Sequence, residues 1–466
     1  MKTNNTICAI STAPGVGGIA VIRVSGKDAV EICDKILMPP KSPEGGLVAQ
    51  PSNTAKFRWI GSPPSGELEG AIFTIFRAPH SFTGEDTVEI SCHGSIFIQQ
   101  QILKLLLEHG CALAQAGEFS QRAFLNGKMD LSQAEAVADL IASTSSASHR
   151  MALNQMRGNF SNELSNLREK LLNFVSLIEL ELDFNEEDVE FADRAELKKL
   201  AVGIEEKISK LADSFNLGNV LKNGIPVALV GETNVGKSTL LNLLLNEEKA
   251  IVSDIHGTTG DVIEDSVNIN GIMFRFIDTA GIRDTKDKIE NLGIERTYRK
   301  IEQASIILWL IDCTQISKHI EWLTEQIAKR AEGKKIILVF NKIDKVDDEE
   351  CKVIEDLFDQ FEAERIYISA KNRINTDKLQ EALIRASQIP ELQADDIVVS
   401  NIRHYEALIN AKSAIQRVID GLNTGISHDF LSQDIRECMH FLGEITGQIS
   451  TDEVLGRIFE RFCIGK

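Results

Sequence analysis

The sequence is short of positive charge. Lysine and arginine number 50 against 69 aspartates and glutamates, so the formal net charge is −19 at pH 7. Broad, purely electrostatic binding of nucleic acid requires a basic surface, and this charge balance excludes it as the main activity. A local basic patch stays compatible with the composition. If an RNA is bound, we expect a partner protein to supply most of the contacts to its phosphates.

Paired cysteines and long apolar runs are also missing. The 8 cysteines are scattered, without a CxxC pair or a Cys/His spacing typical of zinc, so we expect reduced thiols. The N-terminus lacks the apolar stretch of a signal peptide, and no run reaches the length of a membrane-spanning helix. The last four residues, CIGK, differ from a prenylation box at Gly465 and Lys466. We therefore predict a cytoplasmic protein without membrane association.

The length of the chain indicates several domains. A chain of 466 residues is too long for one hydrophobic core, so two or three domains are expected. Residues 1–120 contain short apolar runs between stretches rich in Gly, Pro and Ser, which predicts a small α+β domain. Residues 222–383 alternate strands and helices, which predicts an α/β domain on an open, mostly parallel sheet. Its expected strands are 226–230, 262–269, 273–277, 306–311, 336–340 and 365–368.

Apolar residues at three- and four-residue spacing mark helices on both sides of that α/β region. They are Leu164, Leu167, Leu171, Phe174 and Ile178 in the first block, and Ile402, Tyr405, Leu408, Ile409, Ile415, Val418, Ile419 and Leu422 in the second. More helix is expected from 196 to 215. Neither block is large enough to bury its own apolar faces. We therefore predict one all-α domain, formed by residues 121–221 and 384–466, into which the α/β domain is inserted.

Residues 231–238, GETNVGKS, have the pattern of a phosphate-binding P-loop. They follow the apolar run 227–230 and lead into a helical segment, which is the context that such a loop requires. The glycines let backbone N–H groups turn towards phosphates, and the helix N-terminus adds a favourable field. Lys237 can reach the β- and γ-phosphates, and the Ser238 hydroxyl can bind Mg²⁺. The other nucleotide-binding residues predicted here are Asn234, Val235, Gly236 and Thr239.

Three further segments follow strands of the same region. The first segment, DTAG at 278–281, places the carboxylate of Asp278 beside the metal. In the second, Asp344 can accept hydrogen bonds from N1–H and the 2-amino group of guanine, which adenine cannot offer. The third resembles the loop that backs the base in GTPases. The predicted nucleotide is therefore GTP, with GDP as product. The residues are Asp278, Thr279, Ala280 and Gly281, then Asn341, Lys342 and Asp344, then Ser369, Ala370 and Lys371.

The residue that orients the attacking water is not in its usual place. In Ras-like enzymes a Gln directly after the first segment has this role, whereas the residue here is the apolar Ile282. Hydrolysis is therefore either slow and assisted by a separate activator, or served by another part of the chain. The residues alone do not select among the carboxylates that follow, which are Asp284, Asp287, Glu290 and Glu295.

Six sequence blocks are spread along the whole chain. They are SFTGED at 81–86, GEFSQRAFLN at 117–126, GTT at 257–259, DTAGIR at 278–283, GEITG at 443–447 and CIGK at 463–466. Together they resemble the MnmE (TrmE) family of tRNA-modification GTPases. One position departs from the family pattern, because Gly260 stands where the family usually has Arg. This change bears on the rate and regulation of the enzyme and leaves the Mg²⁺ ligands untouched.

The resemblance implies a GTPase that is activated when its G domains dimerise, with K⁺ replacing an arginine finger. It implies that Glu290 is the catalytic glutamate, acting beside Lys237. The implied Mg²⁺ ligands are Ser238 and Thr259. The implied K⁺ ligands are Asn234, Ser253, Ile255 and Thr258.

The resemblance also implies that the N-terminal domain binds a tetrahydrofolate derivative, either 5-formyl- or methylene-tetrahydrofolate. Arg23, Glu89 and Lys128 would contact the folate, and the C-terminal Lys466 belongs to the same cofactor-binding set. Cys463 lies in the tail that the family directs towards the modification chemistry. Two interpretations stay open for this thiol, a direct catalytic role and a packed structural one.

The partners implied by the resemblance are a second copy of the chain, the FAD-containing protein MnmG (GidA) and tRNA. The copies would join through their N-terminal domains and form a heterotetramer with MnmG. The complex would add an aminomethyl or carboxymethylaminomethyl group at C5 of the wobble uridine of certain tRNAs. The alternative from another class is a regulatory GTPase switch in ribosome assembly. A third possibility is that the N-terminal domain serves dimerisation alone.

Overall fold

The computed structural model divides the chain into two compact units. One comprises Met1–Ala142, Ala152–Ser209 and Glu406–Lys466, and the other Ser143–Met151 and Lys210–Tyr405; we call them the first and second unit. The structure describes residues 5–38, 46–62, 66–183, 194–232, 234–248, 265–277, 301–315, 327, 329–331, 333–358, 362–389, 396–450, 452–460, 462 and 465. Within these residues, no helix combines the length and the apolar content that crossing a membrane requires.

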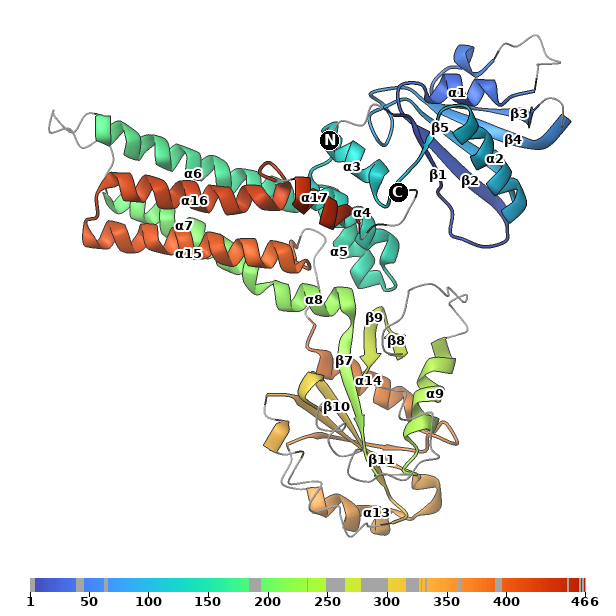
Figure 1. Cartoon of the computed structure of the whole chain (residues 1–466). Helices are drawn as coiled ribbons and strands as arrows, with labels where there is room; N and C mark the ends of the chain where they lie inside the picture. Colours follow the sequence, from blue (N-terminus) through green and yellow to red (C-terminus); the bar gives the residue numbers. More distant parts are fainter. Residues whose placement is uncertain are drawn as a thin grey trace. The chain divides into compact units, whose positions relative to one another are not determined.

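The first unit begins with a six-stranded sheet in the order β3-β4-β5-β2-β1-β6, in which only the β1–β6 pair is parallel. Helices α1 and α2 pack against the same face of the sheet, and together they form one apolar core (Figure 1). This is the predicted α+β domain. Its elements are β1 (Ile7–Ile10), β2 (Gly17–Ser25), α1 (Ala29–Lys35), η1 (Leu47–Ala49), β3 (Thr54–Ser62), β4 (Gly66–Phe76), β5 (Thr87–Gly94), α2 (Ile96–Glu108) and β6 (Ala112–Leu113).

Helices form the rest of the first unit, where α6 and α16 pack side by side (Figure 1). The five residues of the first predicted apolar stripe, from Leu164 to Ile178, are all buried on α6. In the second stripe, Ile402 and Ile409 are exposed, so that packed face is narrower than the sequence pattern indicates. The helices are α3 (Glu118–Leu125), α4 (Leu131–Ala142), α5 (Ser146–Met156), α6 (Asn159–Asp183), α7 (Arg194–Asp213), α15 (Ile402–Thr424), α16 (His428–Thr446) and α17 (Asp452–Phe459). Of these, α5 up to Met151, α7 from Lys210 and α15 up to Tyr405 belong to the second unit.

Four long helices, α6, α7, α15 and α16, are joined by a ring of ion pairs on their surface. Each helix is paired with two others in the cycle α6–α7–α15–α16–α6. The pairs are Glu163–Lys207 (2.6 Å), Glu205–Lys412 (3.7 Å), Asp434–Arg417 (2.7 Å), Glu437–Arg417 and Glu179–Arg436. Helices from two distant stretches of chain therefore belong to one all-α arrangement, as predicted.

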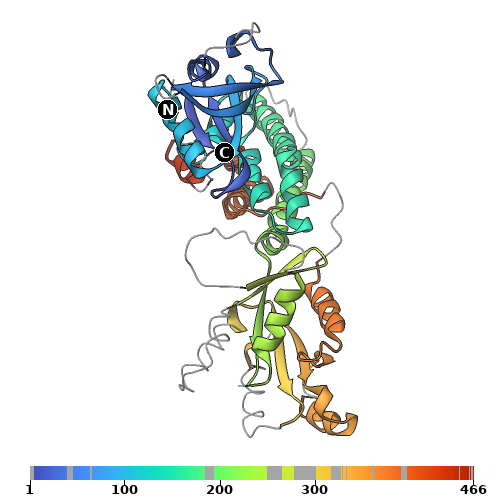
Figure 2. The ribbon, with the colours of Figure 1, turned by 90° about the vertical axis from the view of Figure 1, so that its right-hand side faces the viewer.

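The second unit is built on a six-stranded sheet in the order β12-β11-β10-β7-β9-β8, parallel except for the β8–β9 pair. Apolar residues alternate along β10, so that Leu308 faces a core with α9 and α14, while Trp309 faces a core with α13. Figure 2 shows α9 against the sheet. The elements are α8 (Phe215–Asn223), β7 (Ile225–Val230), α9 (Lys237–Glu248), β8 (Asp265–Ile269), β9 (Ile272–Phe276), β10 (Ile306–Asp312), β11 (Lys335–Asn341), η2 (Ile343–Lys345), α13 (Asp348–Glu355), η3 (Asp356–Phe358), β12 (Glu364–Ile368) and α14 (Thr376–Ser387).

The predicted fold class is confirmed, but the helix expected from 196 to 215 breaks before its end. Helix α7 stops at Asp213 and α8 begins at Phe215. Between them the Ser214 hydroxyl donates to the Leu211 carbonyl (2.6 Å) and accepts from the Val399 N–H (3.0 Å). The segment around Val399 also approaches Gly218 closely, because a Cβ added to Gly218 would lie 2.0 Å from the Val399 carbonyl oxygen. A segment distant in sequence therefore sets the break.

Candidate functional site

The predicted P-loop joins the carboxyl end of β7 to the first turn of α9. Three of its residues have positive φ: Gly231 (149°), Asn234 (64°) and Gly236 (104°). Gly236 also permits a close approach, because a Cβ there would lie 2.4 Å from the Asn341 amide nitrogen. Glycine adopts these backbone angles without steric cost. The loop therefore keeps the tight course predicted for a phosphate cradle; Thr233 lies outside the described residues.

Lys237 and Ser238 open helix α9 at the mouth of this loop. The Lys237 ammonium donates hydrogen bonds to the carbonyl oxygens of Gly231 (2.6 Å) and Glu232 (2.5 Å). Ser238 and Thr239 belong to the first helical turn, where backbone N–H groups have no partner within the helix. The structure therefore gathers a cation, a hydroxyl and a helix N-terminus at one point, which suits an anionic phosphate.

Asn341 joins the P-loop to both predicted base loops. It is buried at the carboxyl end of β11. Its amide nitrogen donates to the Val235 carbonyl (2.7 Å), and its amide oxygen accepts from the Ala370 N–H (3.0 Å). A buried amide that is satisfied on both sides fixes its neighbours. One side chain thus holds together three of the segments that the sequence predicted to share a site.

Asp344 and the loop after β12 form the predicted base-reading edge. Asp344 lies on the exposed turn η2. The hydrogen bond with Ser369 is the largest cause that lowers the pKa of the Asp344 carboxyl, so the group is an ionised acceptor at neutral pH. Ser369 and Ile374 exchange backbone hydrogen bonds of 3.2 and 3.1 Å and close the loop that carries Ala370 and Lys371.

Lys342 contacts a residue that the sequence did not single out. Its backbone has a left-handed φ of 70°, and its ammonium forms an ion pair with Asp312, the last residue of β10. Burial acts to raise the pKa of the Asp312 carboxyl, but hydrogen bonds from Lys342 and Thr314 outweigh it and lower the pKa. Nothing in the spacing of motifs identified Asp312, although it ends the strand next to β11.

Several predicted residues lie outside the described part of the chain. They are Ser253, Ile255, Thr258, Thr259, Asp278, Thr279, Ala280, Gly281, Glu290, Cys463 and Lys466. The described residues include the phosphate loop and the base loops. Among them, no three His, Cys, Asp or Glu side chains gather into a metal-binding group.

Arg23 and Glu89 of the predicted folate set face each other across β2 and β5 and form an ion pair of 2.8 Å. The Arg23 guanidinium also lies 5.4 Å from the centre of the Phe82 ring. Lys128 donates to the carbonyl of Pro79 (2.9 Å), in the same loop as Phe82. Arg23 and Lys128 therefore contact one loop, and Glu89 is joined to it through its ion pair with Arg23.

A buried polar network beneath that loop was missed by sequence reasoning. Arg122 is buried and pairs with Glu85 (3.2 Å) and Glu118 (2.8 Å). Ser25 in turn donates to Glu85 (2.8 Å). The network joins the blocks SFTGED and GEFSQRAFLN, which explains structurally why both contain charged residues. The two sequence blocks could be recognised from the sequence, but the ion pair between Arg122 and Glu85 that joins them could not.

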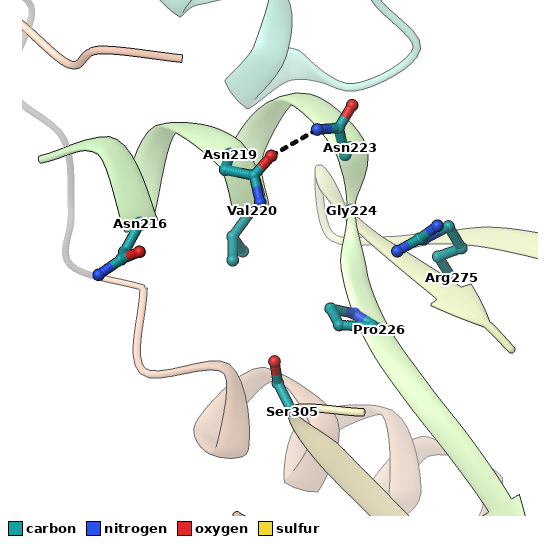
Figure 3. A pocket seen from close by; sticks show the side chains of 8 residues that line it. All are labelled: Asn216, Asn219, Val220, Asn223, Gly224, Pro226, Arg275 and Ser305. Atoms are coloured by element: carbon teal, nitrogen blue, oxygen red, sulfur yellow. Dashed lines mark hydrogen bonds between the residues drawn. The ribbon is translucent and has the colours of Figure 1, made fainter. Parts of the chain in front are cut away.

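A separate hollow of about 640 Å³ lies at the amino end of β7. Figure 3 shows it between α8 and the strand ends, with a hydrogen bond of 2.6 Å from Asn223 to Asn219 on its rim. Ligands of parallel sheets bind beyond the carboxyl ends of the strands. We therefore assign no part of the nucleotide site to this hollow. Its lining residues are Asn216, Asn219, Val220, Asn223, Gly224, Pro226, Arg275 and Ser305.

Comparison with known proteins covers the whole chain. Residues 6–128 match the family model described as the GTP-binding protein TrmE N-terminus, and residues 131–463 match the MnmE helical domain. A solved structure of Aquifex aeolicus Era bound to GDP·AlF4⁻ is 30% identical and covers 40% of this chain and 65% of that chain, with a TM-score of 0.28.

Full-length relatives carry the name tRNA modification GTPase MnmE. The protein of Bacteroides thetaiotaomicron is 58% identical over 99% of both chains. That of Parabacteroides distasonis is 58% identical over 99% of this chain and 100% of its own. That of Flavobacterium johnsoniae is 51% identical over 100% of both. The chain described here is therefore a GTP hydrolase and belongs to the MnmE (TrmE) family of tRNA-modification GTPases.

Proposed function

We propose that this chain is a K⁺-activated GTPase that works with the FAD-containing protein MnmG on the wobble uridine of certain tRNAs. The product of the complex would carry an aminomethyl or carboxymethylaminomethyl group at C5. The observation that carries K⁺ activation is the position of Asn234, which is exposed on the P-loop in a left-handed conformation. An amide oxygen there is a suitable ligand for a hard cation.

The P-loop has the donors that a nucleoside triphosphate requires. Backbone N–H groups at the start of α9 and the Lys237 ammonium would bind the phosphates. The Ser238 hydroxyl fits Mg²⁺ as an oxygen ligand, with Thr259 as the proposed second protein ligand. Asn234 would bind K⁺ together with Ser253, Ile255 and Thr258. A cation beside the β- and γ-phosphates would stabilise the negative charge that develops during transfer.

The base loops have the acceptors and the rigidity that guanine recognition requires. Asp344 would accept from N1–H and the 2-amino group of the base, and its lowered pKa keeps it ionised for that task. Asn341 would hold the P-loop and the loop of Ser369, Ala370 and Lys371 in register through its two hydrogen bonds. Glu290 is the proposed catalytic glutamate, since Ile282 has no polar group with which to orient water.

The test of K⁺ activation is steady-state GTP hydrolysis in KCl and in NaCl at equal ionic strength. We expect faster hydrolysis in KCl for the unmodified chain and loss of that difference in Asn234→Ala. The matched control is Asn270→Ala, because Asn270 is an exposed Asn of the same unit with a φ of 51°. Equal rates in both salts for the unmodified chain would refute the proposal.

We also propose that the N-terminal domain binds a tetrahydrofolate derivative at Arg23, Glu89 and Lys128. A carboxylate can accept from the adjacent N–H groups of a pterin, while cations suit the glutamyl tail. Titration calorimetry with 5-formyl-tetrahydrofolate tests this, with Arg23→Ala expected to weaken binding. Arg58→Ala is the matched control, since Arg58 belongs to the same sheet and its guanidinium donates to the carbonyl of the neighbouring Phe57 (2.9 Å). Unchanged affinity in Arg23→Ala would contradict the proposed site.

Dimerisation through the N-terminal domains is the third part of the proposal. The sheet face opposite α1 and α2 carries four exposed apolar side chains, namely Ile19, Phe57, Trp59 and Ile72. The rings of Phe57 and Trp59 meet edge to face, with centres 5.5 Å apart, above Gly70. The solvent face of an antiparallel sheet is usually polar, so an apolar patch on it supports contact with another protein. We propose a second copy of the chain there, in a complex with MnmG and tRNA.

A further inference from the structure

We infer that Asp312 is a positioning residue for guanine recognition, because it holds the Lys342 ammonium away from the Asp344 carboxylate. This inference rests on the proposed role of Asp344 as the acceptor for guanine. It concerns a residue outside the motifs by which the nucleotide site was predicted. Asp312 acts through Lys342 and does not itself contact the base.

The first step of the argument is the fixed position of the Asp312 carboxylate. Asp312 is opposite Asn341 in the parallel pairing of β10 and β11, beside the start of the base loop. One carboxylate oxygen accepts from the Thr314 N–H (2.9 Å) and the Thr314 hydroxyl (2.6 Å). The other oxygen accepts from the Lys342 ammonium. Both oxygens are occupied, so the carboxylate is a defined anchor for the lysine.

The second step is the course of the chain at Lys342. Its left-handed conformation turns the backbone sharply after β11. Such a conformation is sterically unfavourable for a residue with a side chain. The ion pair with Asp312 offsets part of this cost, because both groups are shielded, with 26% of the lysine side chain and 13% of the aspartate side chain exposed.

The third step is the competition that Asp312 prevents. Lys342 is two residues before Asp344, and a lysine has a flexible four-carbon stem with three rotatable donors. Freed from Asp312, its ammonium would be able to pair with the exposed Asp344 carboxylate, two residues further along the same loop. An ion pair there would occupy the oxygens that guanine needs. In the structure, the Asp344 carboxylate instead forms a hydrogen bond with Ser369 and is stabilised by the charge of Lys345, and both interactions lower its pKa.

The experiment compares the binding of GDP and IDP to the full chain by titration calorimetry. IDP lacks the 2-amino group, so the ratio of the two affinities reports on the contact with Asp344. We expect Asp312→Asn to weaken GDP binding about tenfold, the effect of one charged hydrogen bond, and to lower the GDP-to-IDP ratio. Thr314→Val, which removes one bond to the anchor but no charge, is expected to change both values in the same direction by a smaller factor.

The decisive variant is the double substitution Asp312→Asn with Lys342→Met. Methionine keeps an aliphatic stem and removes the ammonium, so no charge remains to occupy Asp344. We expect the double variant to bind GDP as Lys342→Met alone does, which is a rescue that a general disturbance of the fold would not produce. The control is Glu364→Gln, which breaks an exposed ion pair with Arg385 in the same unit and is expected to leave both affinities unchanged.

Two results would overturn the inference. One is unchanged GDP binding in Asp312→Asn, and the other is an equal loss for GDP and IDP without rescue by Lys342→Met. The variant Asp344→Asn separates this failure from failure of the proposed function. If Asp344→Asn loses the preference for GDP while Asp312→Asn does not, the base-reading proposal stands and only the inference is wrong. If Asp344→Asn keeps the preference, both are wrong.

Discussion

The two six-stranded sheets of this protein differ in which of their surfaces stay open. The sheet of the second unit has an apolar core on each face, so only the ends of its strands are free to form a site. The N-terminal sheet has α1 and α2 on one face. Its other face is covered only in part, where Phe119 of α3 packs against Ile7 and Ala9, and it carries Arg23, Glu89 and exposed apolar side chains. A mostly parallel sheet with helices on both sides therefore directs chemistry to the ends of its strands, whereas an antiparallel sheet with one face largely open can also offer that face.

This difference also decides how visible each site is in the sequence. At the edge of a parallel sheet, each functional loop directly follows a strand, so motif and strand occur together in the chain. On an open face, functional residues alternate with core residues and resemble ordinary surface positions. Substitutions that contrast buried with exposed positions, and one end of a sheet with the other, test this difference.

The largest expected effect is on stability, from the two tryptophans. Trp309 is 1% exposed in the second unit's sheet, where its ring contacts Phe358 edge to face, whereas Trp59 is 48% exposed. We expect Trp309→Ala to lower the free energy of unfolding of its sheet by about 3–5 kcal/mol. Trp59→Ala is expected to cost less than about 1 kcal/mol. Native-state hydrogen exchange of each sheet measures both values, and similar costs would remove the contrast between the faces.

The next effect is on catalysis at the two ends of one sheet. Lys237 lies at the carboxyl end of β7, whereas Lys335 begins β11 at the amino end. We expect Lys237→Ala to lower kcat/KM for GTP by about 100-fold or more, because it removes a charge from the phosphates. Lys335→Ala should leave hydrolysis unchanged. A comparable loss in both variants would show that the carboxyl end of the sheet, where the P-loop lies, has no special role in hydrolysis.

A smaller effect is expected for self-association through the open face. Trp59→Glu places a charge among the four exposed apolar side chains, and we expect it to weaken the proposed dimer about tenfold. The control is Leu107→Glu, since Leu107 is an exposed apolar residue on helix α2. Sedimentation equilibrium measures both. If the two variants dissociate equally, the open face is not the contact surface.

The smallest effect concerns the ring of ion pairs in the first unit. Arg417 pairs with both Asp434 and Glu437, but these groups are largely exposed. We expect Arg417→Ala to lower the unfolding free energy by only about 0.5 kcal/mol and the loss to shrink in high salt. Thermal unfolding at low and high salt tests this. A loss that does not respond to salt would point to packing of the arginine stem instead.

Much of the second unit could be predicted from its sequence. The six strands appear where apolar runs end in glycine or in polar loop residues. The P-loop and Ser369 directly follow β7 and β12, and Asn341 is the last residue of β11. Asp312 escaped prediction because its role depends on the register between β10 and β11, which brings it beside Lys342 from 30 residues away. The spacing of motifs in the sequence does not reveal that strand register.

The N-terminal domain was less accessible to the same reasoning. Its class could be predicted, but the order of its strands places β5 between β4 and β2. That order brings Arg23 to Glu89 across 66 residues, and Arg122 to Glu85 across 37. Such pairs are formed by long-range folding and leave no periodic signal. Only the resemblance to a family pointed to Arg23, Glu89 and Lys128, and their ligand stays a prediction.

The ring of ion pairs has a consequence for how the all-α part assembles from two separate pieces of chain. Sliding any of the four helices by one turn would displace it by about 5.4 Å, which is more than an ion pair can span. Each helix takes part in two links of the ring, so a slipped arrangement would break both at once. The ion pairs therefore favour the helix alignment in which all of them form. They add to the packing of the apolar stripes in favouring one longitudinal match between α6–α7 and α15–α16.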